Sequence, residues 1–279
     1  MIVNPQKGEA AREVALGIIS WLREKGVKVF LSPEGASFLG KEDMALKEDV
    51  FASSIDVALI IGGDGTFLKA SRLLAPYGVP MLGINLGKLG FLVSESIPTL
   101  EVALTKVIEG KFEIEERMML EAQFKGRRIH ALNEFVVMKG AFARIIALRV
   151  FVNNEFLASY PADGIIISTP TGSTAYSLAA GGPILEPGLP AVVLTPICAH
   201  TFYARPIVVS SSSSVRIEVE ADHEDIMLTQ DGQAGFRVSP GDKVLIAKAP
   251  FSARIITFKG RSFFRLLRKK LKLGVVPGD

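Results

Sequence analysis

The chain is short of the residues that build disulfide frameworks and metal clusters. It has one cysteine, Cys198, among 279 residues. A single thiol excludes an intramolecular disulfide framework and any zinc site that needs two or more thiolates. The same shortage predicts a reducing, cytoplasmic setting, because disulfides persist mainly in oxidising compartments.

Long hydrophobic runs are also missing. The longest apolar stretches, such as Val57–Ile61, have five residues, whereas a helix needs about 20 to cross a bilayer. Near the start, Pro5 and Lys7 interrupt the apolar core that a secretory signal requires. We therefore expect neither a membrane partner nor a targeting segment.

Charge of one sign is not in excess. Lys and Arg number 32 against 29 Asp and Glu, which gives a net charge of +3. Nucleic-acid-binding proteins usually carry dense basic faces, so this balance predicts no nucleic-acid partner. Hydrophobic residues make up 48% of the chain, which excludes an intrinsically disordered protein.

The hydrophobic periodicity changes character near residue 111. Before it, apolar runs alternate with helical patterns, which is typical of an α/β domain. After it, apolar residues recur at every second position, and Asn153-Asn154 lies where a tight hairpin turn would fall. We expect helices over 9–25, 66–74 and 99–108, and strands over 1–3, 27–31, 57–61, 81–84, 148–152, 164–168, 215–219, 226–229, 244–247 and 254–258.

The C-terminal stretch Arg261–Leu273 carries six basic residues interleaved with phenylalanine and leucine. This pattern favours an amphipathic helix that packs back on the body of the protein. Contact with a membrane or a nucleic acid is the alternative reading of the same pattern.

The most informative motif follows the apolar strand Val57–Ile61. The motif is GGDGT, Gly62–Thr66. Its three glycines allow a sharp turn whose N–H groups can face an anion. A carboxylate in such a loop would repel a phosphate unless Asp64 is needed for proton transfer or metal positioning. Glycine and aspartate are also ordinary turn residues, so a plain strand–turn–helix connection is the alternative.

Two further segments have the composition of ligand loops. Gly83–Leu92 is rich in glycine and contains Asn85, whose side chain could hydrogen-bond a phosphate or a sugar. In Asp163–Pro183, an apolar strand leads into a run of small hydroxyl residues and then into Tyr176, which offers a stacking face. An N-capped helix with a proline turn would explain only one or two of these hydroxyls.

These motifs together resemble the NAD kinase family. The resemblance rests on Gly62–Thr66, Asn133-Glu134 and Asp163–Pro183, and it extends over nearly the whole chain to Asp231–Gln233. GGDGT alone is moderately specific, because lipid kinases and phosphofructokinase-type enzymes carry relatives of it. The TPTGSTAY segment is highly specific.

The resemblance implies transfer of the γ-phosphoryl group of ATP, or of polyphosphate, to the 2′-hydroxyl of the adenosine ribose of NAD. Asp64 would be the general base and would line the NAD site with Gly65. Asn133 and Glu134 would hold the ribose and nicotinamide portions. The other implied substrate-binding residues are Arg144, Asp163, Thr174, Ala175, Tyr176, Ser177, Leu178, Ala179, Cys198 and Gln233. Judged by its chemistry alone, Cys198 is a small apolar filler rather than a nucleophile.

The resemblance also implies the architecture. We expect a doubly wound, Rossmann-like α/β domain over 1–110, with 259–279 packed back on it, and a β-rich, sandwich-like NAD-binding domain over 111–258. The active site would lie in the cleft between the domains. Family members are homodimers or homotetramers whose NAD sites include residues of an adjacent subunit.

The chain shows no dedicated carboxylate cage for a metal. A divalent cation, Mg²⁺ or Mn²⁺, would therefore be held mainly by the nucleotide phosphates and water, and we assign no protein metal ligand. Two alternatives to an NAD kinase remain at this point. One is a lipid or sugar kinase that shares the GGDGT loop, and the other is a non-catalytic NAD-binding sensor.

Overall fold

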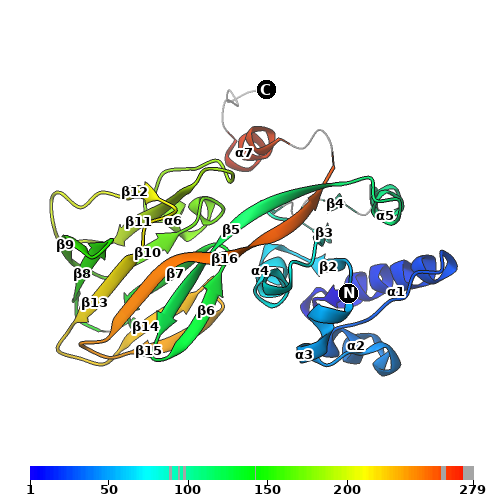
Figure 1. The fold of residues 1–279 in the computed structure, drawn as a ribbon, viewed down its shortest axis with the longest axis horizontal. Coiled ribbons are helices and arrows are strands. Elements are labelled where there is room, and N and C mark those ends of the chain that lie inside the picture. The colour runs from blue at the N-terminus through cyan, green and yellow to red at the C-terminus, as the bar shows by residue number, and fades with distance from the viewer. Residues whose placement is uncertain (88–89, 94, 97–98, 142, 259–261, 273–279) are drawn as a thin grey trace. The chain divides into compact units, whose positions relative to one another are not determined.

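The computed structural model describes every residue except 88–89, 94, 97–98, 142, 259–261 and 273–279. The chain divides into two compact units. Unit 1 consists of Met1–Glu115 and Arg254–Asp279, and unit 2 consists of Glu116–Ala253. Figure 1 labels most of the helices and strands of both units.

Unit 1 is built on a small parallel sheet. Its strands are β1 (Ile2–Val3), β2 (Ala58–Gly62), β3 (Met81–Asn85) and β4 (Glu95–Ser96), and the end of β16 (Lys243–Thr257) joins it through Ile255 opposite Met81. The helices of unit 1 are α1 (Gly8–Glu24), α2 (Pro33–Leu39), α3 (Glu48–Phe51), α4 (Asp64–Leu74), α5 (Leu100–Ile108) and α7 (Phe263–Leu271). All five residues of β2 are buried, as expected for a central parallel strand.

The helix predictions for unit 1 are confirmed, and the reasons are local. In α1 the buried residues Ala11, Ala15, Ile18 and Leu22 recur at helical spacing and pack into the core of this unit. Gly26 follows the helix at a φ of +74°, a left-handed conformation that glycine adopts without steric cost.

One strand prediction is wrong, and two others prove to be parts of a single strand. Residues 27–31 form no strand beyond a single bridge between Leu31 and Ala45. These residues run beside β1, where the Ser32 N–H donates to the Met1 carbonyl. Because β1 has only two residues, the ladder is too short to extend. The segments 244–247 and 254–258 belong to one strand, β16. It continues through Pro250, which is exposed and therefore costs no buried hydrogen bond.

Unit 2 contains two antiparallel sheets. One joins β9 (Glu155–Ala162), β8 (Ile146–Val152), β13 (Val215–Glu220) and β16, with β5 (Glu113–Phe124) and β6 (Arg127–Ala131) beside β16. The other has the order β12 (Ile207–Ser210), β11 (Ala191–Ile197), β10 (Gly164–Ser168), β7 (Glu134–Lys139), β14 (Ile226–Gln230) and β15 (Ala234–Val238). The short helix α6 (Tyr176–Ala179) follows β10.

The core of unit 2 lies between these two sheets. Alternate residues of each sheet point into it, among them Leu148 and Ile217 from one sheet and Ile165 and Ile167 from the other. The sandwich expected for this part of the chain is therefore present. The hairpin between β8 and β9 is confirmed as well, because Asn153 and Asn154 both have positive φ, +52° and +69°, as a two-residue type I′ turn requires.

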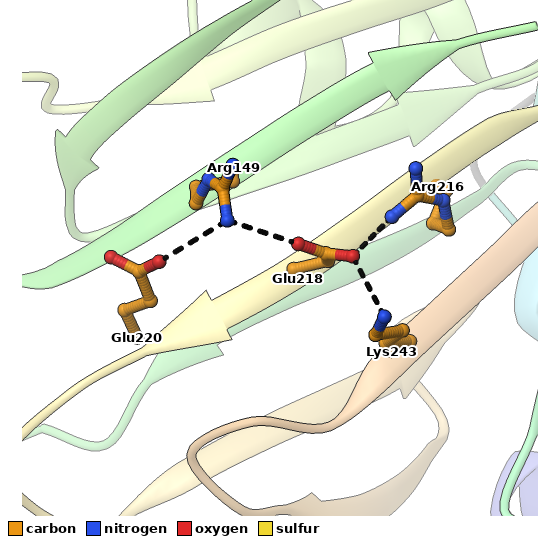
Figure 2. A network of polar contacts seen from close by, with 5 residues as sticks. All are labelled: Arg149, Arg216, Glu218, Glu220 and Lys243. Carbon is orange, nitrogen blue, oxygen red and sulfur yellow. Dashed lines mark hydrogen bonds and ion pairs between the residues drawn. The ribbon is translucent and has the colours of Figure 1, made fainter. Parts of the chain in front are cut away.

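The outer face of the β8–β13–β16 sheet carries a network of ion pairs (Figure 2). Glu218 on β13 pairs with Arg149 at 3.4 Å and with Lys243 at 3.1 Å, and it also pairs with Arg216. Arg149 reaches Glu220 at 3.7 Å. The hydrogen bond from Lys243 is the main cause that lowers the pKa of Glu218. The network links the three strands on the side away from the core.

Candidate active site

The GGDGT segment connects β2 to α4 in unit 1. β2 ends at Gly62, and α4 begins at Asp64. The carboxylate of Asp64 therefore lies in the first turn of a helix, where the helix dipole favours negative charge. A Cβ on Gly62 would lie 2.4 Å from the hydroxyl oxygen of Thr66, so only glycine fits there. The Thr66 hydroxyl in turn accepts a hydrogen bond from the Asn4 amide at 3.0 Å.

The carboxylate of Asp64 binds the backbone of the second glycine-rich segment. Its Oδ2 accepts the N–H of Phe91 at 2.7 Å, and its Oδ1 accepts those of Leu92 and Val93 at 3.1 Å each. A Cβ on Gly90 would lie 1.9 Å from Oδ1, so a glycine is required for this approach. A carboxylate has about four acceptor positions. Three are used by these contacts, and Oδ2 retains acceptor capacity for one more donor.

Asn85, in contrast, is engaged by its own loop. Its side-chain oxygen accepts the N–H of Gly87 at 3.0 Å, and its amide donates to the Gly87 carbonyl at 3.1 Å. This is an Asx-type turn. The structure thus gives Asn85 a local structural role, and the ligand contact that the sequence allowed stays a prediction.

In unit 2 the structure brings Asn133, Glu134 and the 231–233 turn together at one end of β7. Asp231 accepts the N–H of Leu132 at 3.3 Å, of Asn133 at 2.8 Å and of Glu134 at 3.3 Å. Its own N–H donates to the Glu134 carbonyl at 3.0 Å. Gln233, which is exposed, closes the same turn through its N–H to the Gln230 carbonyl at 2.9 Å.

The hydroxyl-rich segment after β10 packs against this end. The Thr169 hydroxyl donates to the Leu132 carbonyl at 2.6 Å, and a Cβ on Gly172 would lie 2.2 Å from the Asn133 carbonyl oxygen. Ser173 is fully buried and bonds to the Pro170 carbonyl and the Leu185 N–H. Internal structure thus accounts for more of these hydroxyls than the sequence reading allowed.

The predicted substrate residues on and before α6 differ in accessibility. The Ser177 hydroxyl is buried and bonds to the Thr195 hydroxyl at 2.9 Å. Tyr176 is 40% exposed, so its ring is available for stacking. Ala179 is exposed, whereas Thr174, Ala175 and Leu178 are partly buried.

Glu134 is the most perturbed carboxyl group in this cluster. Its residue is 4% exposed, and its Oε2 has no hydrogen-bond partner among the described residues. Burial, and then the negative charge of Asp231, raise the pKa of Glu134 to about 8, while the backbone N–H of Tyr176 acts in the opposite direction. Glu134 is therefore mostly a neutral acid at pH 7.

Three predicted residues lie at the opposite end of the same strands. Asp163 precedes β10, donates its N–H to the Ile197 carbonyl at 3.0 Å and pairs with Lys139 at 3.6 Å. Cys198 follows β11, is exposed and has a φ of +46°, so the interpretation as an apolar filler is wrong. Arg144 is exposed and pairs with Asp222 at 3.3 Å. β10 has five residues, so the two ends are roughly 15 Å apart.

Two residues at this site were missed by sequence reasoning. Asp231 was noted only as part of a motif, although its φ of +49° in a non-glycine residue marks a constrained turn. Arg117 is 6% exposed and donates to the Thr171 hydroxyl at 3.2 Å. It is the only basic residue of 113–124, directly before the apolar run Met118–Leu120, and this position was the available signal.

The described residues contain no cluster of three or more His, Cys, Asp or Glu side chains in positions to hold a metal ion. None of the described helices is long and apolar enough to cross a membrane. The basic C-terminal stretch forms α7, in which Leu267 is buried and the Lys270 ammonium lies 5.7 Å from the Phe91 ring centroid.

An α/β unit with a glycine-rich loop at a helix N-terminus, followed by a β-sandwich unit, defines a two-domain protein of the nucleotide-binding kinase class. Family comparison makes this specific. Residues 1–112 match the ATP-NAD kinase N-terminal domain, and residues 132–258 match the ATP-NAD kinase C-terminal domain. The chain belongs to the NAD kinase family.

Individual relatives agree with this assignment. The NAD kinase of Moorella thermoacetica is 46% identical over 98% of this chain and 89% of its own length. That of Desulforamulus reducens is 44% identical over 98% of this chain and 96% of its own length. Among solved structures, yeast NADH kinase complexed with NADH has a TM-score of 0.87 at 26% identity, covering 95% of this chain and 84% of its own. An NAD kinase from Archaeoglobus fulgidus in complex with ATP has a TM-score of 0.74 at 30% identity, and the match covers 92% of this chain and 94% of its own.

Proposed function

We propose that this protein is an NAD kinase, which transfers the γ-phosphoryl group of ATP to the 2′-hydroxyl of the adenosine ribose of NAD. The observation that carries the proposal is the match of both halves of the chain to the two NAD kinase domains. In the reaction the 2′-oxygen forms a bond to the γ-phosphorus while the bond from that phosphorus to the bridging β–γ oxygen breaks. The products are NADP and ADP.

Asp64 is assigned the role of general base in this proposal. Its Oδ2 retains acceptor capacity beside the Phe91 N–H, so it can accept the proton that leaves the 2′-hydroxyl. The three backbone contacts fix the carboxylate in one orientation. Phosphoryl transfer passes through a loose transition state and depends mainly on positioning and charge neutralisation. A carboxylate fixed in this way contributes to the positioning of the 2′-hydroxyl. Gly65 lies next to Asp64 in the same loop.

The NAD-binding roles are assigned to unit 2. Asn133 and Glu134 would hold the ribose and nicotinamide portions, and Gln233 lies on the turn beside them. Tyr176 has the exposed ring that a base or nicotinamide could stack on. Thr174, Ala175, Ser177, Leu178 and Ala179 would then shape the adenine and ribose pocket. Asp163 lies at the other end of these strands, so it would reach this pocket from an adjacent subunit.

The proposal is tested by incubating the purified protein with NAD, Mg²⁺ and either ATP or polyphosphate. Any NADP is then detected by coupling to an NADP-specific dehydrogenase. NADP formation with ATP is the expected result, and the polyphosphate arm determines the range of donors. Absence of NADP with both donors would overturn the proposal. The chain's single cysteine supports a cytoplasmic setting for this reaction.

A divalent cation, Mg²⁺ or Mn²⁺, is part of the proposed reaction. The donor set fits a cation held mainly by the nucleotide, because three of the acceptor positions of Asp64 bind backbone N–H groups and the described residues form no carboxylate cage. When bound, the cation would neutralise charge on the transferring phosphates.

Chelation by EDTA should therefore abolish NADP formation, and added Mg²⁺ or Mn²⁺ should restore it. The check is the coupled assay with the chelator removed again by gel filtration before the metal is added. A melting curve of the EDTA-treated protein serves as the control for unfolding. Activity that persists after thorough chelation would contradict the requirement for a metal.

We also propose a homodimer or homotetramer in which two subunits share one NAD site. The support is the separation of the predicted residues within unit 2. Asn133 lies at one end of the β7–β10–β11 strands, and Asp163, Cys198 and Arg144 are grouped at the other.

Complementation between two inactive variants tests the shared site. Asn133→Ala and Arg144→Ala should each lose activity alone, and co-expressed mixed oligomers should regain part of it because one composite site carries neither change. Mixing two preparations of the same variant is the matched control. No recovery in verified mixed oligomers, or full activity of a sedimenting monomer, would contradict a shared site.

A further inference from the structure

Helix α7 of unit 1 concentrates unpaired positive charge. Residues 263–272 contain no aspartate or glutamate, and their cations are Arg265, Arg268, Lys269, Lys270 and Lys272. This charge exceeds the net charge of the whole chain, which is +3. Within the described part of the chain, none of these five side chains forms an ion pair or a side-chain hydrogen bond. The charges of α7 are therefore available to an anionic ligand.

The packed side of α7 is defined by its burial. Ser262 caps the start of the helix, where its hydroxyl oxygen accepts the Arg265 N–H at 3.4 Å. Leu267 is buried, whereas Lys269 and Lys270 are exposed. On a helix, residues three apart are neighbours on one side, and residues two apart are not. Lys270 therefore borders the packed side of α7, and Lys269 points away from it.

Lys270 contacts the loop whose backbone binds Asp64. Its ammonium lies 5.7 Å from the centroid of the Phe91 ring. The backbone N–H of the same Phe91 donates to Oδ2 of Asp64 at 2.7 Å. One residue therefore connects this ammonium to the carboxylate that is assigned as the general base. Lys69 of α4, by contrast, is engaged in an ion pair with Glu34 at 2.6 Å.

The helix dipole offers an ordinary explanation for basic residues in the last turn, because cations stabilise the C-terminal end of a helix. Arg268, Lys269 and Lys270 all lie in that turn, and for the dipole they are equivalent. The contact with Phe91 distinguishes Lys270 from Lys269. The dipole alone does not account for a cation at the Asp64 loop, and a second role for Lys270 is indicated.

The ligand chemistry that fits this position is a chain of phosphates. In the proposed reaction the γ-phosphorus must reach the 2′-oxygen whose proton Asp64 accepts, so the adjoining phosphates lie close to the loop of Phe91. A triphosphate carries about four negative charges, and its transfer depends on neutralising them. Lysine binds phosphate as a point charge. Its flexible four-carbon stem allows the ammonium to move from the ring to a phosphate oxygen.

We propose that Lys270 is a substrate-binding residue whose ammonium binds the phosphate chain of the phosphoryl donor beside the Asp64 loop. This inference rests on the proposed function. It adds a residue for the donor, whereas the residues assigned above bind NAD or accept the proton of its hydroxyl. It also gives α7 a place in the donor site of unit 1.

The coupled assay on Lys270→Ala tests this role. The KM for ATP should rise about tenfold or more, because a charge-assisted hydrogen bond is lost. The KM for NAD should stay within about threefold, because NAD makes no contact with this residue. Lys270→Arg keeps the charge, so its KM for ATP should stay within about threefold of the unmodified value.

Lys269→Ala is the matched control for Lys270→Ala. It removes a cation from the same turn and so costs the helix the same dipole stabilisation. Because Lys269 points away from the Phe91 loop, both KM values should stay within about twofold of those of the unmodified protein.

Calorimetric titration without NAD identifies the chemical group that Lys270 binds. Mg·ATP and inorganic tripolyphosphate should each bind about tenfold more weakly to Lys270→Ala than to the unmodified protein. The loss should be much smaller with AMP, which has a single phosphate. An equal loss for ATP and AMP would contradict recognition of the phosphate chain.

An unchanged KM for ATP in Lys270→Ala, an equal rise in Lys269→Ala, or a rise confined to NAD would overturn the inference. Failure of the proposed function gives a different result. A protein that binds Mg·ATP through Lys270 and makes no NADP contradicts only the kinase activity. A protein that makes NADP with an unaltered Lys270→Ala variant contradicts only the role of Lys270. A protein that neither binds ATP nor makes NADP contradicts both.

Discussion

Asp64→Asn is expected to lower kcat by about 10² or more while NAD affinity changes by no more than a few-fold. The amide removes the charge and the basicity at the position that accepts the 2′-hydroxyl proton, and general-base catalysis typically contributes about 10²–10⁴ in rate. By transition-state arithmetic this is about 3–5 kcal/mol. The variant also loses acceptors for the Phe91–Val93 backbone, so a lower melting temperature is expected as well.

Gly90→Ala is the control for that structural effect. Its Cβ would displace the Asp64 carboxylate from its backbone partners but would leave its charge in the protein. If Asp64 is the base, kcat should fall further in Asp64→Asn than in Gly90→Ala. A loss of less than about tenfold in Asp64→Asn would assign Asp64 to the loop alone.

Glu134→Gln should make the protein more stable than the unmodified chain at ~pH 8.5 and no more stable at ~pH 5. The folded protein keeps a proton on Glu134 up to a pKa of about 8, whereas the unfolded chain releases it near the ordinary glutamate pKa of 4.5. Between these two pKa values Glu134 therefore holds more protons in the folded protein than in the unfolded chain. The free energy of unfolding falls as the pH rises across this interval.

The full span of that effect is of the order of 4–5 kcal/mol, since each pKa unit corresponds to about 1.36 kcal/mol. Glutamine removes the pH dependence, although its second amide proton at a buried position offsets about 1–2 kcal/mol of the gain. Thermal melts of both proteins at the two pH values measure the difference. Glu155→Gln, at an exposed position of unit 2, is the matched control. A stability difference that does not change with pH would contradict the buried neutral acid.

Local signals were sufficient for much of the fold. The buried spacing of α1 and the paired asparagines of the β8–β9 hairpin are properties of short segments, and both were predicted. The failures depend on partners elsewhere. Residues 27–31 have strand-like composition, but a strand exists only where a neighbouring strand continues beside it. β16 continues through Pro250 because the proline is exposed, and exposure is decided by the tertiary fold.

The candidate site shows the same limit. GGDGT and the hydroxyl-rich segment were visible as motifs, yet the contacts that organise them are distant in sequence. Asp64 binds residues 27 to 29 positions further on, and Asp231 binds residues 97 to 99 positions before it. Sequence reasoning also placed Arg144, Asp163 and Cys198 in one pocket with Asn133. It could not show that these three residues lie at the end of the paired strands β7, β10 and β11 opposite to Asn133.

The most direct test of the account follows the γ-phosphoryl group of labelled ATP in the presence of NAD and Mg²⁺. The account predicts that the label appears in NADP, in a product that an NADP-specific dehydrogenase accepts, and that Asp64→Asn transfers about 1% of it or less in the same time. Label released as inorganic phosphate, or passed to a lipid or a sugar while NAD stays unchanged, would contradict it.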